Sequence, residues 1–277
     1  MSELPISATT RLFALLGDPV AHSASPRLYN AAFRAAGLDA AYAALRCGPA
    51  DVPGLMRGLA RAGGGGNVTV PHKATAAGAL EDATAAVART GACNTFWFEY
   101  DRVRGDNTDV AGFRAAAAAV IGSLAGTRVL LLGAGGAARA VVAALLDAPA
   151  ERVLVRNRSR VRAEGLLADF DADPARLAFA PHDAALRRER FDLVVNATSL
   201  GLHPGDPLPL DLATLGGAGA VLDLVYSAEE TPLVLAARAR GLPAADGKRM
   251  LVAQAEAAFV RWFGRTPPEG VMGAALG

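Results

Sequence analysis

Cysteine and histidine are scarce in this 277-residue chain, and neither is clustered. Its two cysteines, Cys47 and Cys93, stand alone, so we expect buried free thiols in a reducing cytoplasm rather than disulfides. The four histidines are spread over the chain, at His22, His72, His182 and His203. Their spacing matches no metal site, so no metal is expected.

An excess of charge and a membrane-spanning run are also lacking. With 28 basic and 27 acidic residues the net charge is +1, which gives no electrostatic footprint for nucleic acid. Residues 1–10 contain no basic stretch followed by an apolar run, so we expect no secretory signal. The apolar stretch 129–146 contains glycines and Arg139 and is short for a membrane helix. The composition therefore predicts a globular, cytoplasmic α/β protein with neither a nucleic-acid nor a membrane partner.

Apolar segments alternate between strand and helix patterns along the chain. Strands are expected at residues 11–16, 41–46, 67–70, 94–100, 102–104, 128–132, 152–155, 193–195 and 221–225. Helices are expected at 52–62, 137–146, after Asp109, and from a Ser25 cap to Gly37. Only the glycines at 63–66 look like a low-complexity linker. This βαβ rhythm predicts a parallel, doubly wound sheet in each half.

A glycine motif in the second half predicts a dinucleotide site. The strand 129–132 runs into G-x-G-x-x-A, a pattern made by Gly133, Ala134, Gly135, Gly136, Ala137 and Ala138. The first glycine allows a tight turn, the second lets the backbone approach a pyrophosphate, and the small last residue lets helix pack on strand. Free N–H groups at the helix start would hold the phosphates. Strand, turn and helix together favour the nucleotide interpretation over an ordinary turn.

The residues after the next strand indicate which nucleotide. An NAD site usually ends this strand with an acid, whereas this chain has Asn157, Arg158, Ser159 and Arg162. A guanidinium suits a ribose 2′-phosphate by charge and by its bidentate fork. A solvated basic loop is the alternative. Position favours NADP, because the adenosine ribose is expected here.

Candidates for catalysis lie in the first half. Residues 66–73 read Gly-Asn-Val-Thr-Val-Pro-His-Lys, an apolar strand ended by Pro71, with Lys73 at the mouth of the next helix. The helix dipole there disfavours the charged amine and makes it a better proton donor or acceptor near neutrality. Asp109 follows 36 residues later at another helix start, and Asn94 lies between them.

Three motifs in this half resemble the shikimate dehydrogenase family, whose members carry NVTxPxK, GAxNT and GDNTDxxG in the order found here at 67–73, 91–95 and 105–112. The resemblance runs from Gly17 to Gln254. It implies an α/β fold of two domains: a substrate domain (1–109 plus 247–277) with a mostly parallel sheet, and a Rossmann-type NADP domain (110–246). It also implies reduction of 3-dehydroshikimate to shikimate in aromatic amino-acid biosynthesis, by a monomer or homodimer.

The resemblance assigns roles residue by residue. Lys73 would supply the proton and ionised Asp109 would position it. The implied substrate-binding residues are Ser23, Ser25, Asn67, Thr69, Asn94, Tyr226 and Gln254. The cofactor residues include the two motifs above together with Thr198, Ser199 and Gly247. A quinate/shikimate or aminoshikimate dehydrogenase is a second interpretation. A non-catalytic nucleotide sensor is a third, disfavoured because a sensor needs no proton donor.

Overall fold

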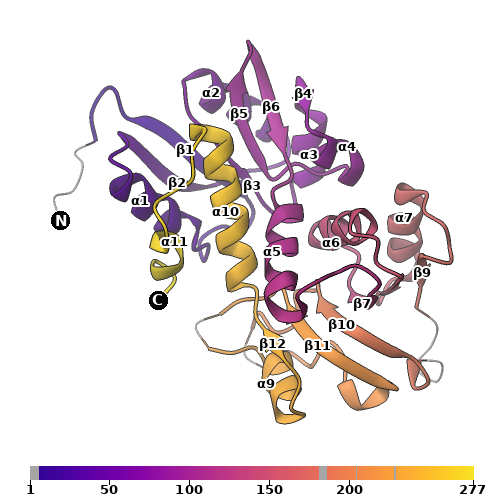
Figure 1. Ribbon diagram of the computed structural model, residues 1–277. Helices are drawn as coiled ribbons and strands as arrows, with labels where there is room; N and C mark the ends of the chain where they lie inside the picture. Colours follow the sequence, from indigo (N-terminus) through magenta and orange to yellow (C-terminus); the bar gives the residue numbers. More distant parts are fainter. Residues whose placement is uncertain (1–5, 181–185, 204, 228) are drawn as a thin grey trace. The chain divides into compact units, whose positions relative to one another are not determined.

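The computed structural model describes residues 6–180, 186–203, 205–227 and 229–277, which form two compact units (Figure 1). Unit 1 comprises Met1–Gly112 and Val252–Gly277, and unit 2 comprises Phe113–Leu251. These boundaries fall inside the helices α5 (Asp109–Ile121) and α10 (Lys248–Phe263), whereas the sequence prediction drew them at 109 and 247.

Unit 1 is built on a six-stranded mixed sheet in the order β2-β1-β3-β5-β6-β4. The strands are β1 (Arg11–Gly17), β2 (Ala40–Arg46), β3 (Gly65–Val68), β4 (Asp82–Ala83), β5 (Thr95–Glu99) and β6 (Arg102–Asp106). Its helices are α1 (Ser25–Ala35), α2 (Val52–Arg61), α3 (Lys73–Gly78), α4 (Ala85–Thr90) and α11 (Val271–Ala274). Three strand pairs are parallel, and the two made by β5, with β3 and with its hairpin partner β6, are antiparallel.

Two local predictions in unit 1 are wrong. Strand β3 begins at Gly65 and ends at Val68, not at 67–70, so half of the expected glycine linker is strand. Neighbouring strands pass too closely for side chains, since a Cβ on Gly66 would lie 2.1 Å from the Ala14 carbonyl oxygen. The N-cap of α1 is Ala24 rather than Ser25, which is the first helical residue and makes no capping hydrogen bond.

Unit 2 has the fully parallel, doubly wound sheet that the sequence predicts. Its order is β12-β11-β10-β7-β8-β9, which is the strand order of a dinucleotide-binding fold. The strands are β7 (Arg128–Leu132), β8 (Arg152–Arg156), β9 (Leu177–Phe179), β10 (Arg190–Asn196), β11 (Gly217–Asp223) and β12 (Ala244–Ala245). The helices are α6 (Gly136–Asp147), α7 (Arg160–Phe170), α9 (Pro232–Ala239) and the 3₁₀ helix η1 (Leu212–Thr214).

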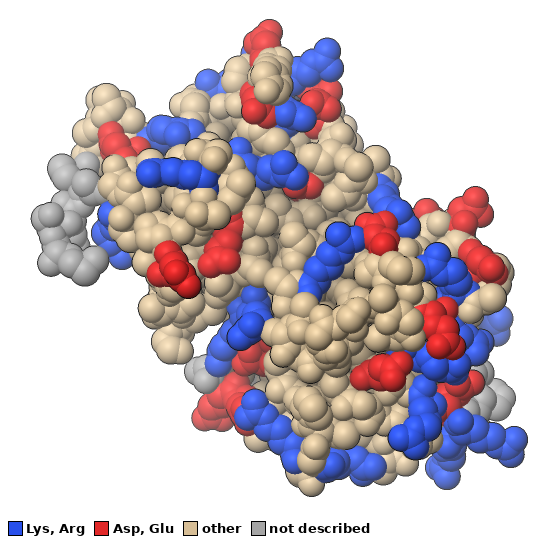
Figure 2. All heavy atoms as spheres, in the orientation of Figure 1, with Lys and Arg blue, Asp and Glu red and all other residues tan. Residues whose placement is uncertain are grey.

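Burial explains why the central strands are so apolar. Val129, Leu130, Leu131 and Leu132 are all at most 2% exposed, as expected for a parallel strand covered on both faces. The apolar stretch 129–146 is thus a buried strand followed by α6. Within the described ranges, no helix combines the length and apolarity needed to span a bilayer. Basic and acidic side chains are interspersed on the face shown in Figure 2.

Candidate active site

Lys73 and Asp109 form an ion pair in unit 1. Lys73 is the first residue of α3 and Asp109 the first residue of α5. The Lys73 Nζ donates a short hydrogen bond to Asp109 Oδ2, and the two side chains are only 15% and 9% exposed. A carboxylate in the first turn of α5 also interacts favourably with the helix dipole. The structure thus joins two residues that the sequence separates by 36 positions.

Asn94 holds the other carboxylate oxygen of Asp109. Its Nδ2 donates to Asp109 Oδ1 over 2.9 Å, and its Oδ1 accepts from the Thr108 backbone N–H over 2.8 Å. Asn94 immediately precedes β5, whose antiparallel partner β6 leads into residues 107–109. Both oxygens of Asp109 are therefore fixed by named partners.

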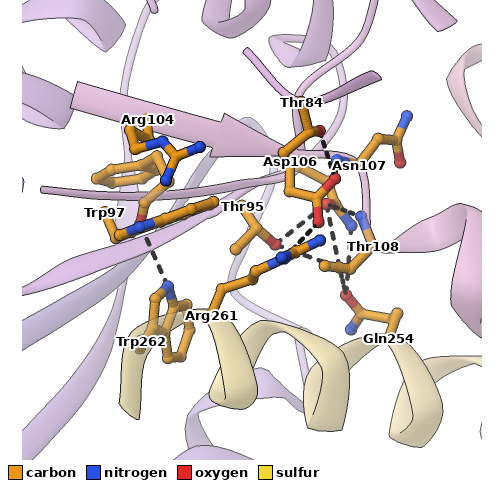
Figure 3. Close-up of polar contacts among 12 residues, drawn as sticks. Thr84, Thr95, Trp97, Arg104, Asp106, Asn107, Thr108, Gln254, Arg261 and Trp262 are labelled. Carbon is orange, nitrogen blue, oxygen red and sulfur yellow. Dashed lines mark hydrogen bonds and ion pairs between the residues drawn. The ribbon is translucent and has the colours of Figure 1, made fainter. Parts of the chain in front are cut away.

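Gln254 brings α10 to the same cluster (Figure 3). Its Oε1 accepts from Asn94 Nδ2 and from Thr108 Oγ1, each over 3.4 Å. Both contacts are long for hydrogen bonds. Gln254, Asn94, Asp109 and Lys73 thus form one polar cluster.

The buried side-chain amide of Asn67 makes its hydrogen bonds to other groups of the protein. It is 5% exposed, and its Nδ2 donates to the Asn94 carbonyl over 3.1 Å and to Thr95 Oγ1 over 2.9 Å. Its Oδ1 accepts from the Tyr42 hydroxyl over 2.8 Å. Asn67 is therefore placed to orient Asn94. Sequence reasoning missed Tyr42, because nothing in its strand distinguishes it from a core tyrosine.

Ser23, Ser25 and Thr69 follow the ends of neighbouring strands. Because β1 and β3 are parallel, with Leu16 beside Val68, the residues that follow them share one edge of the sheet. Ser23 Oγ donates to Ser25 Oγ over 3.2 Å, so the two hydroxyls face one side as predicted. Thr69 is tied by its backbone N–H to the Leu16 carbonyl over 2.8 Å, and in the described ranges its hydroxyl makes no hydrogen bond.

The glycine motif of unit 2 fits a pyrophosphate. Gly133 has φ +108°, and a Cβ there would lie 2.8 Å from the Ala197 carbonyl oxygen, so only glycine fits. Gly135 caps α6 in an extended conformation, and no atom lies within 4 Å of where its Cβ would be. Open space therefore lies above the free N–H groups at the start of α6, where Ala134, Gly136 and Ala137 also stand.

Two arginines beside α7 are available to a phosphate. Arg158 and Arg162 are exposed, and within the described part of the chain neither side chain makes an ion pair or hydrogen bond. Ser159 caps α7 by accepting from the Arg162 N–H, and Asn157 Nδ2 donates to the Ser159 carbonyl over 2.8 Å. Arg160, by contrast, is bonded to Glu164 over 2.7 Å and stacks on Phe179.

A buried carboxylate organises the loops at the ends of β10 and β11. Asp223 accepts from Asn196 Nδ2 over 2.8 Å and from Thr231 Oγ1 over 2.7 Å, and its burial raises its pKa. Asn196 in turn accepts from the N–H and hydroxyl of Thr198. These contacts were not expected from the sequence, although the two residues end the neighbouring strands β10 and β11.

The remaining predicted residues of unit 2 lie near these loops. Ser199 is exposed, and Tyr226 is partly buried, three residues after the end of β11. Gly247 has no room for a side chain, because a Cβ would lie 2.2 Å from the Leu224 carbonyl oxygen.

The surroundings of the two cysteines and of His72 indicate a structural role. Cys47 and Cys93 are free and buried, and burial raises the pKa of Cys93 to about 12. The His72 ring lies 2.8 Å from the Cys47 carbonyl oxygen and is buried. His182 lies outside the described residues. Among those described, no group of three or more His, Cys, Asp or Glu side chains is arranged to hold a metal.

Comparison with known proteins identifies the family. Models of the shikimate dehydrogenase substrate-binding domain, shikimate/quinate 5-dehydrogenase and the shikimate 5′-dehydrogenase C-terminal domain match residues 15–96, 115–202 and 247–276. Shikimate dehydrogenase (NADP⁺) of Methylocella silvestris is 44% identical, over 94% of this chain and 93% of its own. The Aquifex aeolicus shikimate dehydrogenase structure superposes with a TM-score of 0.88 at 33% identity, covering 98% of this chain and 99% of its own. A Thermus thermophilus structure in complex with NADP(H) and shikimate has a TM-score of 0.83 at 37% identity, covering 96% and 98%. With its motifs, fold and polar cluster all in agreement, this chain belongs to the shikimate dehydrogenase family.

Proposed function

We propose that this chain is an NADP-dependent shikimate dehydrogenase, which interconverts 3-dehydroshikimate and shikimate. The observation that carries the proposal is the part-buried Lys73–Asp109 pair, fixed by Asn94, in a chain 44% identical to a shikimate dehydrogenase (NADP⁺) over almost its whole length. We further propose that the enzyme acts in biosynthesis in the cytoplasm, as a monomer or a homodimer.

The side chains of unit 1 divide the work of the reaction. Lys73 donates a proton to the substrate oxygen as the 3-keto group is reduced, and takes it back in the reverse direction. Asp109 keeps the Lys73 ammonium in place by its ion pair. Asn94 and Gln254 bind ring hydroxyls, the paired hydroxyls of Ser23 and Ser25 bind the carboxylate, and Thr69 adds a further contact. The family resemblance adds Tyr226, a residue of unit 2, to the substrate-binding residues. Asn67 keeps Asn94 oriented.

Unit 2 binds the nucleotide. The N–H groups at the start of α6 hold the pyrophosphate, and Arg158 and Arg162 bind the 2′-phosphate, with Asn157 and Ser159 shaping their loop. Thr198, Ser199 and Gly247 lie at the nicotinamide end. NADPH, when bound, supplies the hydride, so the protein contributes alignment and charge.

Spectrophotometric assays test the proposal. The enzyme is assayed with shikimate and with quinate, each with NADP⁺ and with NAD⁺. Shikimate with NADP⁺ is expected to give the highest kcat/KM. A preference for quinate would favour the paralogue interpretation. Nucleotide binding without turnover of any of these acids would favour a sensor and overturn the proposal.

A further inference from the structure

Arg261 reaches the catalytic segment from the same helix as Gln254. The two residues are seven positions apart on α10, which is about two helical turns, so they share one face. Arg261 Nε donates to Asp106 Oδ2 over 2.8 Å, while Gln254 contacts Thr108. Figure 3 shows both side chains extending from α10 toward the segment 106–108. Helix α10 therefore contacts the segment 106–108 at two points, and this segment leads directly into Asp109.

Asp106 is a buried carboxylate whose one cationic partner, among the described residues, is Arg261. Its side chain is 8% exposed. Asp106 Oδ1 accepts from Thr84 Oγ1 over 2.6 Å and from the Asn107 N–H over 2.8 Å, which leaves Oδ2 to Arg261. Removing one partner of such a pair leaves an uncompensated charge in a region of poor solvation.

The backbone of Asp106 is tied directly to the residues that hold Asp109. The Asp106 carbonyl accepts from the Asn94 N–H over 3.0 Å. Asn94 then bonds to the Thr108 N–H and to the Asp109 carboxylate. A shift of Asp106 therefore moves both the asparagine and the aspartate that face Lys73.

The loss of an ion pair between exposed side chains would have little effect on the catalytic residues. Arg104 illustrates that case, because its partners Asp82 and Glu99 are 39% and 41% exposed and would remain solvated without it. Exposed pairs of this kind contribute little. The Asp106 side chain lacks that solvation, so its position depends on Arg261, although Arg261 itself is 48% exposed.

We propose that Arg261 is a positioning residue for the reaction, acting through Asp106 to hold Asn94 and Asp109 in register with Lys73. The proposal rests on the function proposed above. It assigns Arg261 no contact with substrate or cofactor.

The test compares Arg261→Met, Asp106→Asn and the double variant with the wild type. Methionine keeps the apolar stem of Arg261 but removes its charge. A small misplacement of catalytic groups has large kinetic effects, so each single variant is expected to lower kcat roughly tenfold and to raise the calorimetric Kd for shikimate at least about threefold. The KM for NADP⁺ is expected to stay unchanged, since the nucleotide residues lie in unit 2.

The double variant is expected to lose no more activity than the worse single variant, because residues that act through one contact are not additive. Arg261→Lys, which restores a cation, is expected to recover most of kcat. Arg265→Met is the matched control: among the described residues, the Arg265 side chain hydrogen-bonds to the Ala36 carbonyl alone, at the surface, so its loss should leave both kcat and Kd unchanged.

The two tryptophans of the chain monitor the local packing. The Arg261 guanidinium lies 6.0 Å from the Trp97 ring centre, and Trp262 Nε1 donates to the Phe96 carbonyl. An unchanged far-UV circular dichroism spectrum shows that a variant is folded, while the tryptophan emission reports the loss of the guanidinium beside Trp97. Wild-type kcat and shikimate Kd in folded Arg261→Met overturn the inference, as do fully additive losses in the double variant. If Arg261→Met does not fold, Asp106→Asn decides alone. A wild-type enzyme without shikimate turnover overturns the proposed function instead.

Discussion

Lysine occurs only twice in this chain, and the two lysines have different surroundings. Lys248 is 34% exposed and lies 3.4 Å from Asp246, which is 17% exposed. Lys73 is more buried and is paired with a carboxylate whose two oxygens are both held by protein groups. Such positioning is what a proton donor requires, because general acid–base catalysis depends on geometry before pKa.

Lys73→Ala is expected to lower kcat by roughly two to four orders of magnitude, the range typical of a lost general acid or base. Shikimate binding should weaken far less, because Asn94 and Gln254 remain. Steady-state kinetics and calorimetric binding measure the two effects. Near-normal turnover in a folded Lys73→Ala protein would refute the assignment. Full activity in Asp109→Asn would show that the Asp109 carboxylate only stabilises the start of α5.

Residues with a local motif could be predicted, and residues defined by their partners could not. Lys73, Asn94 and Asp109 each stand in a short recognisable pattern, and the structure brings them together. Tyr42 and Arg261 bind residues 25 and 155 positions away, and nothing in their neighbourhoods marks them. Periodicity describes which face is buried, but it does not describe a polar contact between distant segments.

At the scale of elements, the start of α7 is expected to select the cofactor. Charge-assisted contacts are worth about 1.5–3 kcal/mol each, so Arg158→Ala should raise KM for NADP⁺ at least about tenfold while leaving NAD⁺ nearly unchanged. Arg160→Ala is the control, because that guanidinium is already bonded to Glu164. Equal losses for both cofactors would mean that Arg158 acts through folding instead of the 2′-phosphate.

The adjoining ends of β10 and β11 should give unit 2 a pH-dependent stability. Burial raises the folded-state pKa of Asp223, so the folded state binds more protons than the unfolded state above about pH 4. This contribution is full at low pH and is lost as pH rises through the raised pKa. In urea unfolding, the stability difference between the wild type and Asp223→Asn should therefore be larger at pH 5 than at pH 8.

Asp39 provides a control of opposite sign for that measurement. Hydrogen bonds from Thr10 and Thr9 lower its pKa, so its contribution is present above the unfolded value and lost as pH falls. The difference between wild type and Asp39→Asn should shrink on acidification. The same pH trend in both variants would contradict the role given to burial at Asp223.

The sequence predicts elements well where burial alone shapes them. Strand β7 was predicted at its observed bounds, because a strand covered on both faces is a continuous apolar run. Strand β3 was predicted two residues too late, because glycine has a low propensity for strands. Here the glycines are needed because the neighbouring backbone passes too close for a side chain. The two-residue strands β4 and β12 are too short to show any period.

At the scale of the whole molecule, the order of the motifs along the chain was enough to predict the fold and the family. The choice of substrate depends instead on local contacts within unit 1. Shikimate bears its carboxylate on a flat, unsaturated ring carbon. Quinate carries a hydroxyl on a tetrahedral carbon there and needs room and a polar partner beside the carboxylate. Ser23 and Ser25 already share a hydrogen bond, and Ser25 is only 6% exposed. In the function proposed above both hydroxyls bind the carboxylate, so neither is free for the extra group.

We therefore predict a kcat/KM for shikimate at least about ten times that for quinate, since a buried hydroxyl without a partner costs about 1–3 kcal/mol. Ser23→Ala should reduce this preference, because it enlarges the site beside the carboxylate and weakens the binding of both acids. Thr9→Ala, a hydroxyl deletion at an exposed position, should leave the ratio unchanged. The ratio is measured with saturating NADP⁺ for all three proteins. Comparable efficiency on the two acids in the wild type would assign the chain to the quinate/shikimate dehydrogenases.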